Sequence, residues 1–263
     1  MTTDSTEPVR TRTEGSTLVV TLDRPHRANA LTEPMMRELR ELWARVAADR
    51  MLRSVVITGA GKAFCAGADV AMLAEPRSDV GATAAEELSF LPGPHLGIPV
   101  IAAVNGVCAG GGLHFVADAD ICIAAEAARF VDPHVTVGQV SGLEPIELML
   151  RMRRDRAVRM ALLGSSEVLD AQTALAAGLV SEVVADEDLL PAALELGARI
   201  AAGSPEAIRA TREVIRTFEA DLLRRHLDAG WRRVQEHWSH PDAAEGPQAF
   251  AERRPPSWTP LGQ

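Results

Sequence analysis

Three consecutive glycines at positions 110–112 constrain this chain more than any other feature of its sequence. The apolar run Pro99–Val104 precedes them and the apolar segment Leu113–Ala117 follows, which is typical of a strand, a tight turn and a helix. Because glycine has no Cβ, a ligand can approach the bare backbone, where free N–H groups and the positive end of the next helix dipole would face it. The turn has neither the Lys-Ser/Thr ending of a nucleotide P-loop nor G-x-G-x-x-G spacing. The pattern therefore fits an anion or oxyanion site and a buried tight turn equally well.

Strand and helix patterns alternate before the chain becomes mostly helical beyond Pro145. Thr32 predicts the N-cap of a helix that ends near Asp49, and Ser204 predicts a later cap. Continuous apolar runs predict four strands, at Thr17–Leu22, Arg53–Thr58, Pro99–Val104 and Asp120–Ala124. With 263 residues, 47% of them hydrophobic, the chain is long enough for a layered α/β core. We expect that core in residues 1–195 and a helical C-terminal subdomain in residues 196–263.

Three segments are predicted to be irregular. The chain before Thr17 reads as a loose arm, and Gly59–Asp69 reads as a glycine- and alanine-rich loop that either holds a ligand or turns the chain. Pro76–Gly97 carries one short helix pattern, at Ala82–Phe90, among several helix breakers. This last segment fits a lid or substrate-facing insert and a plain surface loop equally well.

Composition excludes several classes of function. The net charge of −9 leaves no basic footprint for nucleic acid or an anionic membrane surface. No apolar run approaches the roughly 18 residues of a membrane span, and the N-terminal residues lack the apolar region of a signal peptide. We therefore expect a cytoplasmic protein. Its cysteines, Cys65, Cys108 and Cys122, lack C-x-x-C spacing, which predicts reduced core residues and no metal site.

Four groups of motifs, taken in order along the chain, carry a resemblance to a known family. They are Leu22–Pro25 with Ala28–Leu31, Val55–Gly59 with Ala63–Asp69, Ala103–Gly112, and Glu245–Arg254. Together they resemble the crotonase, or enoyl-CoA hydratase/isomerase, superfamily over nearly the whole chain. The resemblance implies an α/β superhelix of β-β-α units and C-terminal helices that pack in a homotrimer, often a dimer of trimers. It also implies an acyl-CoA thioester as ligand, with coenzyme A as part of the substrate and no separate cofactor.

The resemblance assigns a binding site residue by residue. The family's oxyanion hole corresponds to the backbone N–H groups of Ala68 and Gly111, which suits a thioester carbonyl that becomes an enolate. The acyl-CoA substrate would lie along a set of small and polar residues, namely Arg27, Ala28, Ala30, Ala66, Asp69 and Gly110.

The resemblance breaks at the two positions where the hydratases carry acid–base glutamates. They correspond here to His114, three residues after the middle glycine, and to His134 in the Phe-x-x-Pro-His stretch. Each histidine alone is compatible with a structural role, but two on both positions favour catalysis. Because His114 lies near a helix N-terminus, we expect it to be neutral and to act as a base or hydrogen-bond donor. We expect His134 to pair with Asp132 or Glu144, which would keep it charged or fix its tautomer.

Three functions remain open from the sequence. The first is an enzyme of the enoyl-CoA hydratase/isomerase type, a lyase in its commonest form, with a histidine pair in place of the glutamate pair. The second is a hydrolase of CoA thioesters or of C–C bonds in β-diketones, in which His134 and Glu144 activate water. The third is a non-catalytic acyl-CoA binder. RNA binding, known from a basic branch of the family, is disfavoured by the net charge of −9.

Overall fold

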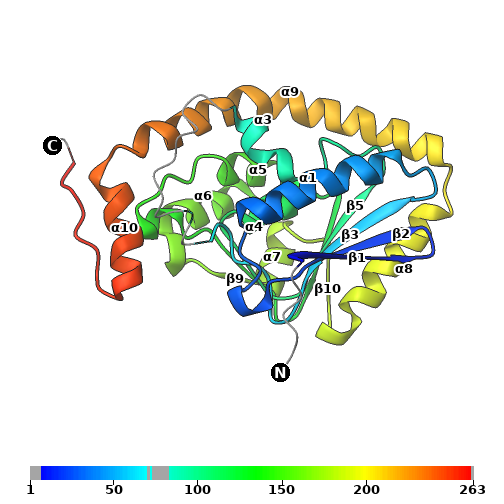
Figure 1. The fold of residues 1–263 in the computed structure, drawn as a ribbon, viewed down its shortest axis with the longest axis horizontal. Coiled ribbons are helices and arrows are strands. Elements are labelled where there is room, and N and C mark those ends of the chain that lie inside the picture. Colours follow the sequence, from blue (N-terminus) through cyan, green and yellow to red (C-terminus); the bar gives the residue numbers. More distant parts are fainter. Residues whose placement is uncertain (1–6, 70–71, 73–82, 262–263) are drawn as a thin grey trace.

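Two β-sheets form the core of the molecule (Figure 1). The structure, a computed structural model, describes residues 7–69, 72 and 83–261. The larger sheet has the strand order β1-β2-β3-β5-β7-β10 and the smaller one the order β4-β6-β8-β9. The strands are β1 Val9–Glu14, β2 Thr17–Leu22, β3 Ser54–Gly59, β4 Ala63–Cys65, β5 Val100–Val104, β6 Val107–Ala109, β7 Ile121–Ala125, β8 Arg129–Val131, β9 Leu169–Asp170 and β10 Glu182–Val184.

Successive strand pairs wind the chain into a superhelix. The pairs β3/β4, β5/β6 and β7/β8 each place their first strand in the larger sheet and their second in the smaller one. Within each sheet the strands of these three pairs run parallel to one another, so every turn of the chain returns in the same direction. This arrangement confirms the predicted α/β crotonase fold.

Helices complete the layers around the two sheets. The longer ones are α1 Glu33–Ala48, α4 Gly112–Asp118, α5 Glu144–Arg151, α6 Arg154–Leu163, α7 Ala171–Ala177, α8 Leu189–Ala201, α9 Pro205–His237 and α10 Pro241–Glu252. The shorter ones are α3 Ala84–Glu87, η1 Pro25–Arg27, η2 Leu88–Phe90, η3 His134–Val137, η4 Gly164–Ser166 and η5 Asp186–Asp188. Figure 1 shows α9 running along one side of the molecule, with α10 beyond its end.

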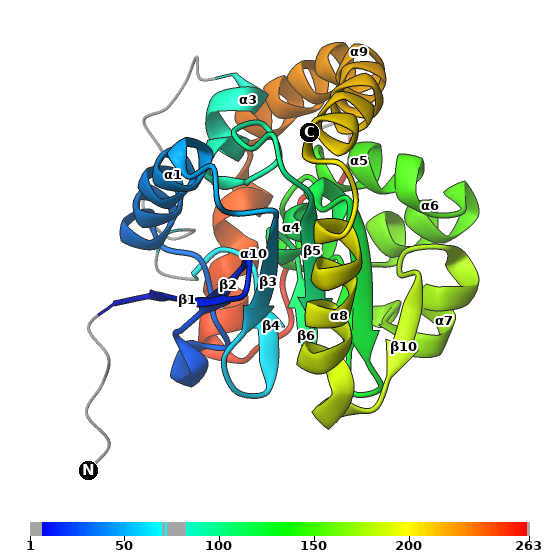
Figure 2. The same ribbon diagram turned by 90° about the vertical axis from the view of Figure 1, so that its right-hand side faces the viewer.

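The alternation of side chains along the central strands divides the core into two clusters. In β3, Val55 and Ile57 join the main core, whereas Val56 between them joins a smaller cluster under α8. The two faces of a strand alternate residue by residue, so a fully apolar run must be buried on both sides. Figure 2 shows α1 and α8 on opposite sides of the larger sheet.

Most of the predicted elements are confirmed, and two predictions are wrong. Thr32 caps α1, and its side chain accepts a hydrogen bond from the backbone N–H of Met35 at 3.4 Å. The supposedly loose arm contains β1, which pairs with β2 through a tight turn at Gly15. Only its first residue is buried, so β1 has no apolar periodicity to reveal it. The predicted loop Gly59–Asp69 contains the short strand β4, which belongs to the second sheet.

Two asparagines from the recognised motifs fix the turn between β3 and β4. The buried Asn29 donates from its side chain to the carbonyl oxygens of Ala60 at 2.9 Å and Ala63 at 2.8 Å. Asn105 accepts from the backbone N–H of Gly59 at 3.0 Å and donates to the carbonyl of Gly61 at 3.0 Å. Since unpaired buried carbonyls are costly, these side chains stabilise a turn that has few backbone partners of its own.

Two arginines hold the C-terminal end of α4. The Arg151 Nε donates to the carbonyl oxygen of Ala117 at 2.8 Å, and its guanidinium also reaches the carbonyl of Ala119. Arg216 from α9 donates to the carbonyl of Asp118 and pairs with its carboxylate. Positive charge at a helix C-terminus is stabilising, so helices α5 and α9 fix the short buried helix that follows the glycine turn.

Some predictions lie outside what the structure tests. Residues 73–82 of the predicted lid or surface loop are not among the described residues, whereas α3 and η2 lie within the predicted short helix. The predicted boundary between residues 195 and 196 falls inside α8, and the division into two units stays a prediction. Over the described ranges, none of the helices has both the length and the apolar character needed to cross a bilayer.

Candidate functional site

Three backbone segments, 28–31, 66–69 and 109–111, meet at the glycine turn. The first two pair through hydrogen bonds from Leu31 N to Gly67 O at 2.7 Å and from Asp69 N to Leu31 O at 2.9 Å. A Cβ built on Gly67 would lie only 2.9 Å from the carbonyl oxygen of Ala109 and 3.1 Å from the nitrogen of Gly111. Gly67 also has a φ of +87°, which disfavours any residue with a side chain. Glycine at 67 therefore lets the second and third segments touch.

The backbone nitrogens of Ala68 and Gly111 lie close together at this junction. A Cβ built on Gly111 would be 3.7 Å from the Ala68 nitrogen. Both residues lie outside the helices and strands, and among the described residues neither N–H donates in the hydrogen bonds of the turns and loops. Gly111 is also the N-cap residue of α4, so the positive end of that helix points to the same place. Two free donors and a helix dipole thus converge on one spot.

The residues predicted to lie along the substrate surround this junction, with one exception. Ala66 N donates to Ala28 O at 3.0 Å, which joins Ala28 and the buried Ala30 to the 66–69 segment. Asp69 accepts from the guanidinium of Arg24 at 3.1 Å. Arg27 is exposed at the end of η1. The structure therefore brings the small residues together, whereas the side chain of Arg27 is directed to solvent.

His114 is buried on α4 between two carboxylates of α5. Its Nδ1 lies 2.5 Å from Glu147 Oε2, and its Nε2 lies 3.1 Å from Glu144 Oε1. The two glutamates are three residues apart in the first turn of α5, so they share one face of that helix. The side chain of His114 is only 6% exposed, so both contacts lie in a region of low dielectric.

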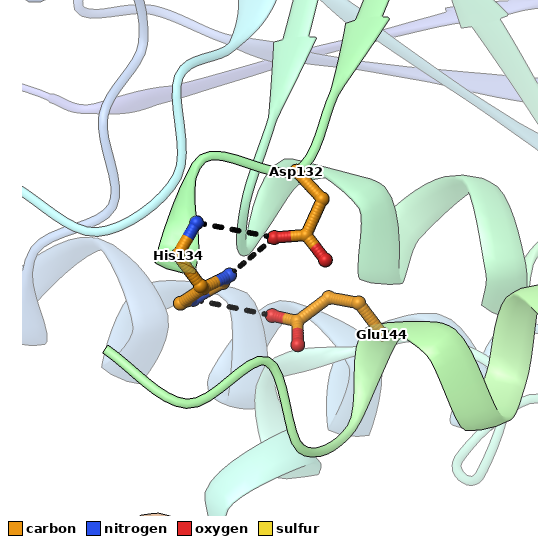
Figure 3. A group of neighbouring side chains, drawn as sticks. All are labelled: Asp132, His134 and Glu144. Carbon is orange, nitrogen blue, oxygen red and sulfur yellow. Dashed lines mark hydrogen bonds and ion pairs between the residues drawn. The ribbon is translucent and has the colours of Figure 1, made fainter. Parts of the chain in front are cut away.

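His134 follows β8 and touches two carboxylates as well (Figure 3). Its Nδ1 lies 2.6 Å from Asp132 Oδ1, and its Nε2 lies 3.6 Å from Glu144 Oε1. Ser141 Oγ donates to the other oxygen of Asp132 at 2.5 Å, which orients that carboxylate. The ring also approaches the glycine turn, since a Cβ built on Gly110 would lie 3.5 Å from His134 Cε1. His134 is therefore the ring beside Gly110, the residue that precedes the free N–H of Gly111.

Five side chains thus form a row of alternating acids and bases, which we name the acid–imidazole cluster. Its members, in spatial order, are Glu147, His114, Glu144, His134 and Asp132.

Charge within the cluster is set by competition between burial and pairing. Burial lowers the pKa of His114, but the carboxylates of Glu147 and Glu144 outweigh it and raise that pKa well above 6.5. Burial also lowers the pKa of His134, but the carboxylates of Glu144 and Asp132 outweigh burial and raise that pKa to about 9. For Glu144, burial raises the pKa, but the two imidazoles outweigh burial and hold the pKa far below its usual range. The surrounding carboxylates therefore favour the imidazolium form of both rings at neutral pH, and the rings in turn favour the ionised form of Glu144.

The expectation that His114 is neutral is wrong. The dipole of α4 acts only from the helix that carries His114, and that helix has seven residues. The decisive groups are on α5, which places a carboxylate against each nitrogen of the ring. The expectation that His134 pairs with Asp132 and Glu144 is confirmed.

Glu147 is the site residue that the sequence did not reveal. It lies among apolar residues of α5, in the first turn, where an acid is also favourable simply through the helix dipole. Its one distinctive signal is its spacing of three residues from Glu144, which places both carboxylates on one helical face. That spacing gave no hint that the face is buried against a histidine.

Asp132, His134 and Glu144 each offer a potential ligand atom, all within 4.8 Å of one another. Tetrahedral Zn²⁺ with bonds of about 2.0–2.1 Å would separate its ligand atoms by about 3.3 Å. The 2.6 Å contact between Asp132 Oδ1 and His134 Nδ1 is a hydrogen bond and is too short for such a pair. The arrangement fits proton transfer better than metal binding, and the absence of a metal site stays a prediction.

Comparisons with known proteins agree with this fold. Residues 12–260 match the family described as enoyl-CoA hydratase/isomerase. The chain is 34% identical over 258 residues to (E)-benzylidenesuccinyl-CoA hydratase of Thauera aromatica, covering 95% of this chain and 98% of that protein. It is 37% identical over 254 residues to carnitinyl-CoA dehydratase of Proteus mirabilis, covering 94% and 96%. The crystal structure of carnitinyl-CoA hydratase from Mycobacterium avium superposes with a TM-score of 0.85 at 30% identity, covering 97% of this chain and 99% of that one.

The chain therefore belongs to the enoyl-CoA hydratase/isomerase family and is an acyl-CoA enzyme of that type.

The raised pKa of His134 predicts a dependence of stability on pH. A base whose folded pKa exceeds its unfolded value adds stability below the unfolded value and loses it as pH rises through the folded one. For His134 that interval runs from the ordinary imidazole pKa of about 6.5 to a pKa of about 9 in the folded protein. We expect wild type to lose about 1–3 kcal/mol of unfolding free energy over this interval relative to His134→Gln, since one pKa unit corresponds to about 1.4 kcal/mol and partial exposure screens the pairing. Urea unfolding of both proteins across the interval measures this loss, and parallel curves would contradict it.

Proposed function

We propose that this enzyme adds water to, or removes it from, an acyl-CoA thioester whose carbonyl is held by the N–H groups of Ala68 and Gly111. The observation that carries the proposal is the position of His134. Its ring lies beside Gly110, the residue before the free N–H of Gly111, and it shares Glu144 with His114. Fixed donors that stabilise the enolate oxygen are typically worth about 100- to 1,000-fold in rate each. The hydratases and dehydratases among the relatives support the same class of reaction.

In this proposal His134 and Glu144 do the acid–base work of the two glutamates in the family's hydratases, and His114 stays charged beside them. Hydration needs a base for the water proton and an acid for C2 of the substrate. The Glu144 carboxylate is the base, and the His134 imidazolium is the acid. Water oxygen bonds to C3, its proton goes to Glu144, and the Nε2 proton of His134 goes to C2. The proton then passes from Glu144 to Nε2 across the 3.6 Å that separates them, which restores the cluster.

Sharing one carboxylate between two imidazolium ions couples these steps. Glu144 is a weak base while both rings are charged, because their charges lower its pKa. Once His134 has given its proton to the substrate, one of these charges is gone and Glu144 becomes more basic. The water proton is therefore accepted most readily as the substrate is protonated. His114, held on both sides, keeps its proton throughout.

Family membership also supports proposals for the CoA-binding surface and for the oligomeric state. We propose that the substrate's CoA portion lies along Ala28, Ala30 and Ala66, beside Asp69, and that Arg27 lies near its charged end.

Exposed apolar residues follow one face of α9, where Val214 is 72% and Phe218 63% exposed and Leu222 continues the spacing. This face supports a homotrimer or a dimer of trimers, and light scattering that finds a monomer would contradict it.

A second candidate is hydrolysis of a thioester or of a C–C bond in a β-diketone. The observation that favours it is again the pair His134 and Glu144, since a histidine beside a carboxylate can activate water. It requires a neutral ring, whereas the carboxylates around His134 hold its pKa at about 9. The lyase reaction uses the ring as it stands at neutral pH and is therefore preferred. A non-catalytic acyl-CoA binder remains the alternative if no reaction is found.

The test is a panel of substrates with products identified by mass spectrometry. The purified protein is incubated with crotonyl-CoA, a longer enoyl-CoA and a β-keto acyl-CoA. We expect a gain of one water by an enoyl-CoA and its loss from the matching 3-hydroxyacyl-CoA. Release of free CoA or cleavage of the β-keto compound would favour hydrolysis. Thermal stabilisation by acyl-CoA without turnover would identify a non-catalytic acyl-CoA binder and contradict the lyase proposal.

Neighbouring glycines offer a matched pair of variants for the oxyanion site. In Gly111→Ala the new methyl group meets only ordinary contacts, 3.4 Å from Leu31 Cδ1 and 3.7 Å from the donor nitrogen of Ala68. We expect this protein to fold and to lose about 100- to 1,000-fold in kcat/KM. In Gly112→Ala the methyl group would be 2.4 Å from the carbonyl oxygen of Cys65, so we expect a loss of stability of about 1–3 kcal/mol or more.

Melting temperatures and kcat/KM of both variants show whether a loss of activity comes from the carbonyl site or from a loss of stability. A fully active Gly111→Ala enzyme would exclude this junction as the carbonyl site.

A further inference from the structure

We infer that Glu147 is a positioning residue that holds the His114 proton and thereby keeps Glu144 ionised. The inference rests on the proposed function, because it assigns Glu147 to the same reaction. Glu147 contacts Nδ1 of His114, whereas the opposite ring nitrogen, Nε2, faces Glu144. It therefore acts through the histidine rather than on a substrate.

The surroundings of Glu147 leave His114 as its charge partner. Its side chain is 10% exposed, and in the described part of the chain it contacts no cation other than His114. Burial raises the pKa of Glu147, His114 lowers it, and the nearby carboxylates of Glu144 and Asp118 raise it further. A buried carboxylate in so acidic a neighbourhood is costly unless it is paired. The ring of His114 supplies that pairing, so the two groups depend on each other.

The other groups that face His114 cannot replace Glu147. Glu144 is already shared with His134, and Asp118 on the same helix is bound by Arg216 and by the backbone N–H of Gly93. Without the charge of Glu147, burial favours the neutral form of His114. The depression of the Glu144 pKa by His114 would then be lost as well. Glu147 thus maintains the ionised base without touching the substrate.

The geometry also fixes which ring can act as the acid. His114 is 6% exposed and has a carboxylate on each nitrogen, whereas His134 is 26% exposed and has its longer contact, 3.6 Å, on Nε2. Each N–H of the His114 ring is bound to a carboxylate, so neither proton is available to the substrate. We therefore assign His114 the role of a fixed positive charge and His134 that of the proton donor.

The experiment compares Glu147→Gln, Glu147→Asp and the control Glu195→Gln, an exposed glutamate of α8. Glutamine keeps the size and a hydrogen-bond acceptor but removes the charge. For Glu147→Gln we expect kcat/KM at pH 8 to fall about 10- to 100-fold, the range typical when a carboxylate partner of a functional histidine is removed. Because a neutral His114 no longer lowers the pKa of Glu144, the acid limb of the pH profile should move to higher pH. Aspartate should restore part of the activity, and the control should behave as wild type.

A second readout does not need turnover. The pKa of His114, followed by NMR of the ¹⁵N-labelled imidazole, should fall in Glu147→Gln and stay in the control. If wild type processes no acyl-CoA, the proposed function fails, and this titration still decides the role of Glu147. An unchanged His114 pKa, or a loss of activity with an unchanged pH profile, would overturn the inference.

A double-mutant cycle with His114→Gln covers the case in which the single variant folds poorly. Removing both members of a buried charge pair is less damaging than removing one, because no unpaired charge is left. We therefore expect the doubly substituted protein to be more stable than the sum of the two single effects predicts. Strictly additive effects on the melting temperature would contradict the pairing.

Discussion

The site depends on one buried carboxylate shared by two imidazole rings. Glu144 lies 3.1 Å from Nε2 of His114 and 3.6 Å from Nε2 of His134, with its own side chain 6% exposed. In such a place an unpaired charge would be neutralised, so each member of the cluster keeps its charge only because of its neighbours. The order of acids and bases, ending in Glu147 on one side and Asp132 on the other, is therefore one electrostatic unit rather than five independent groups.

The fold provides the rigid frame that such a unit requires. His114 comes from α4, whose C-terminal carbonyls are held by Arg151 and Arg216, and its partners come from the first turn of α5. His134 is placed by its position directly after β8, and Gly67 lets the donor segment approach the glycine turn. Elements from both sheets and from the C-terminal helices thus determine the distances within the site. A change in any of them would alter the charges as well as the geometry.

The sequence was sufficient for the fold class and for the segments that meet at the glycine turn, but not for the electrostatics of the residues beside it. The motifs around Asn29, Asn105 and the three glycines predict local turns, and these turns are where the chain crosses between sheets. The strand β1 was missed because it is exposed apart from its first residue. The charge of His114 was mispredicted for a different reason. It is decided by contacts across 30 and 33 residues of sequence, from Glu144 and Glu147, and no local pattern reports which face of α5 packs on α4.

We propose that the imidazolium form of His134, and not its neutral form, is the active one. The pH dependence of kcat/KM for the wild-type enzyme tests it most directly, because that ratio reports the ionisations of the free enzyme. We expect activity that is level through neutral pH and falls as the pH rises through the His134 pKa of about 9. Activity that rises with a pKa near the ordinary imidazole value of about 6.5 would show that a neutral histidine is required and would contradict the account.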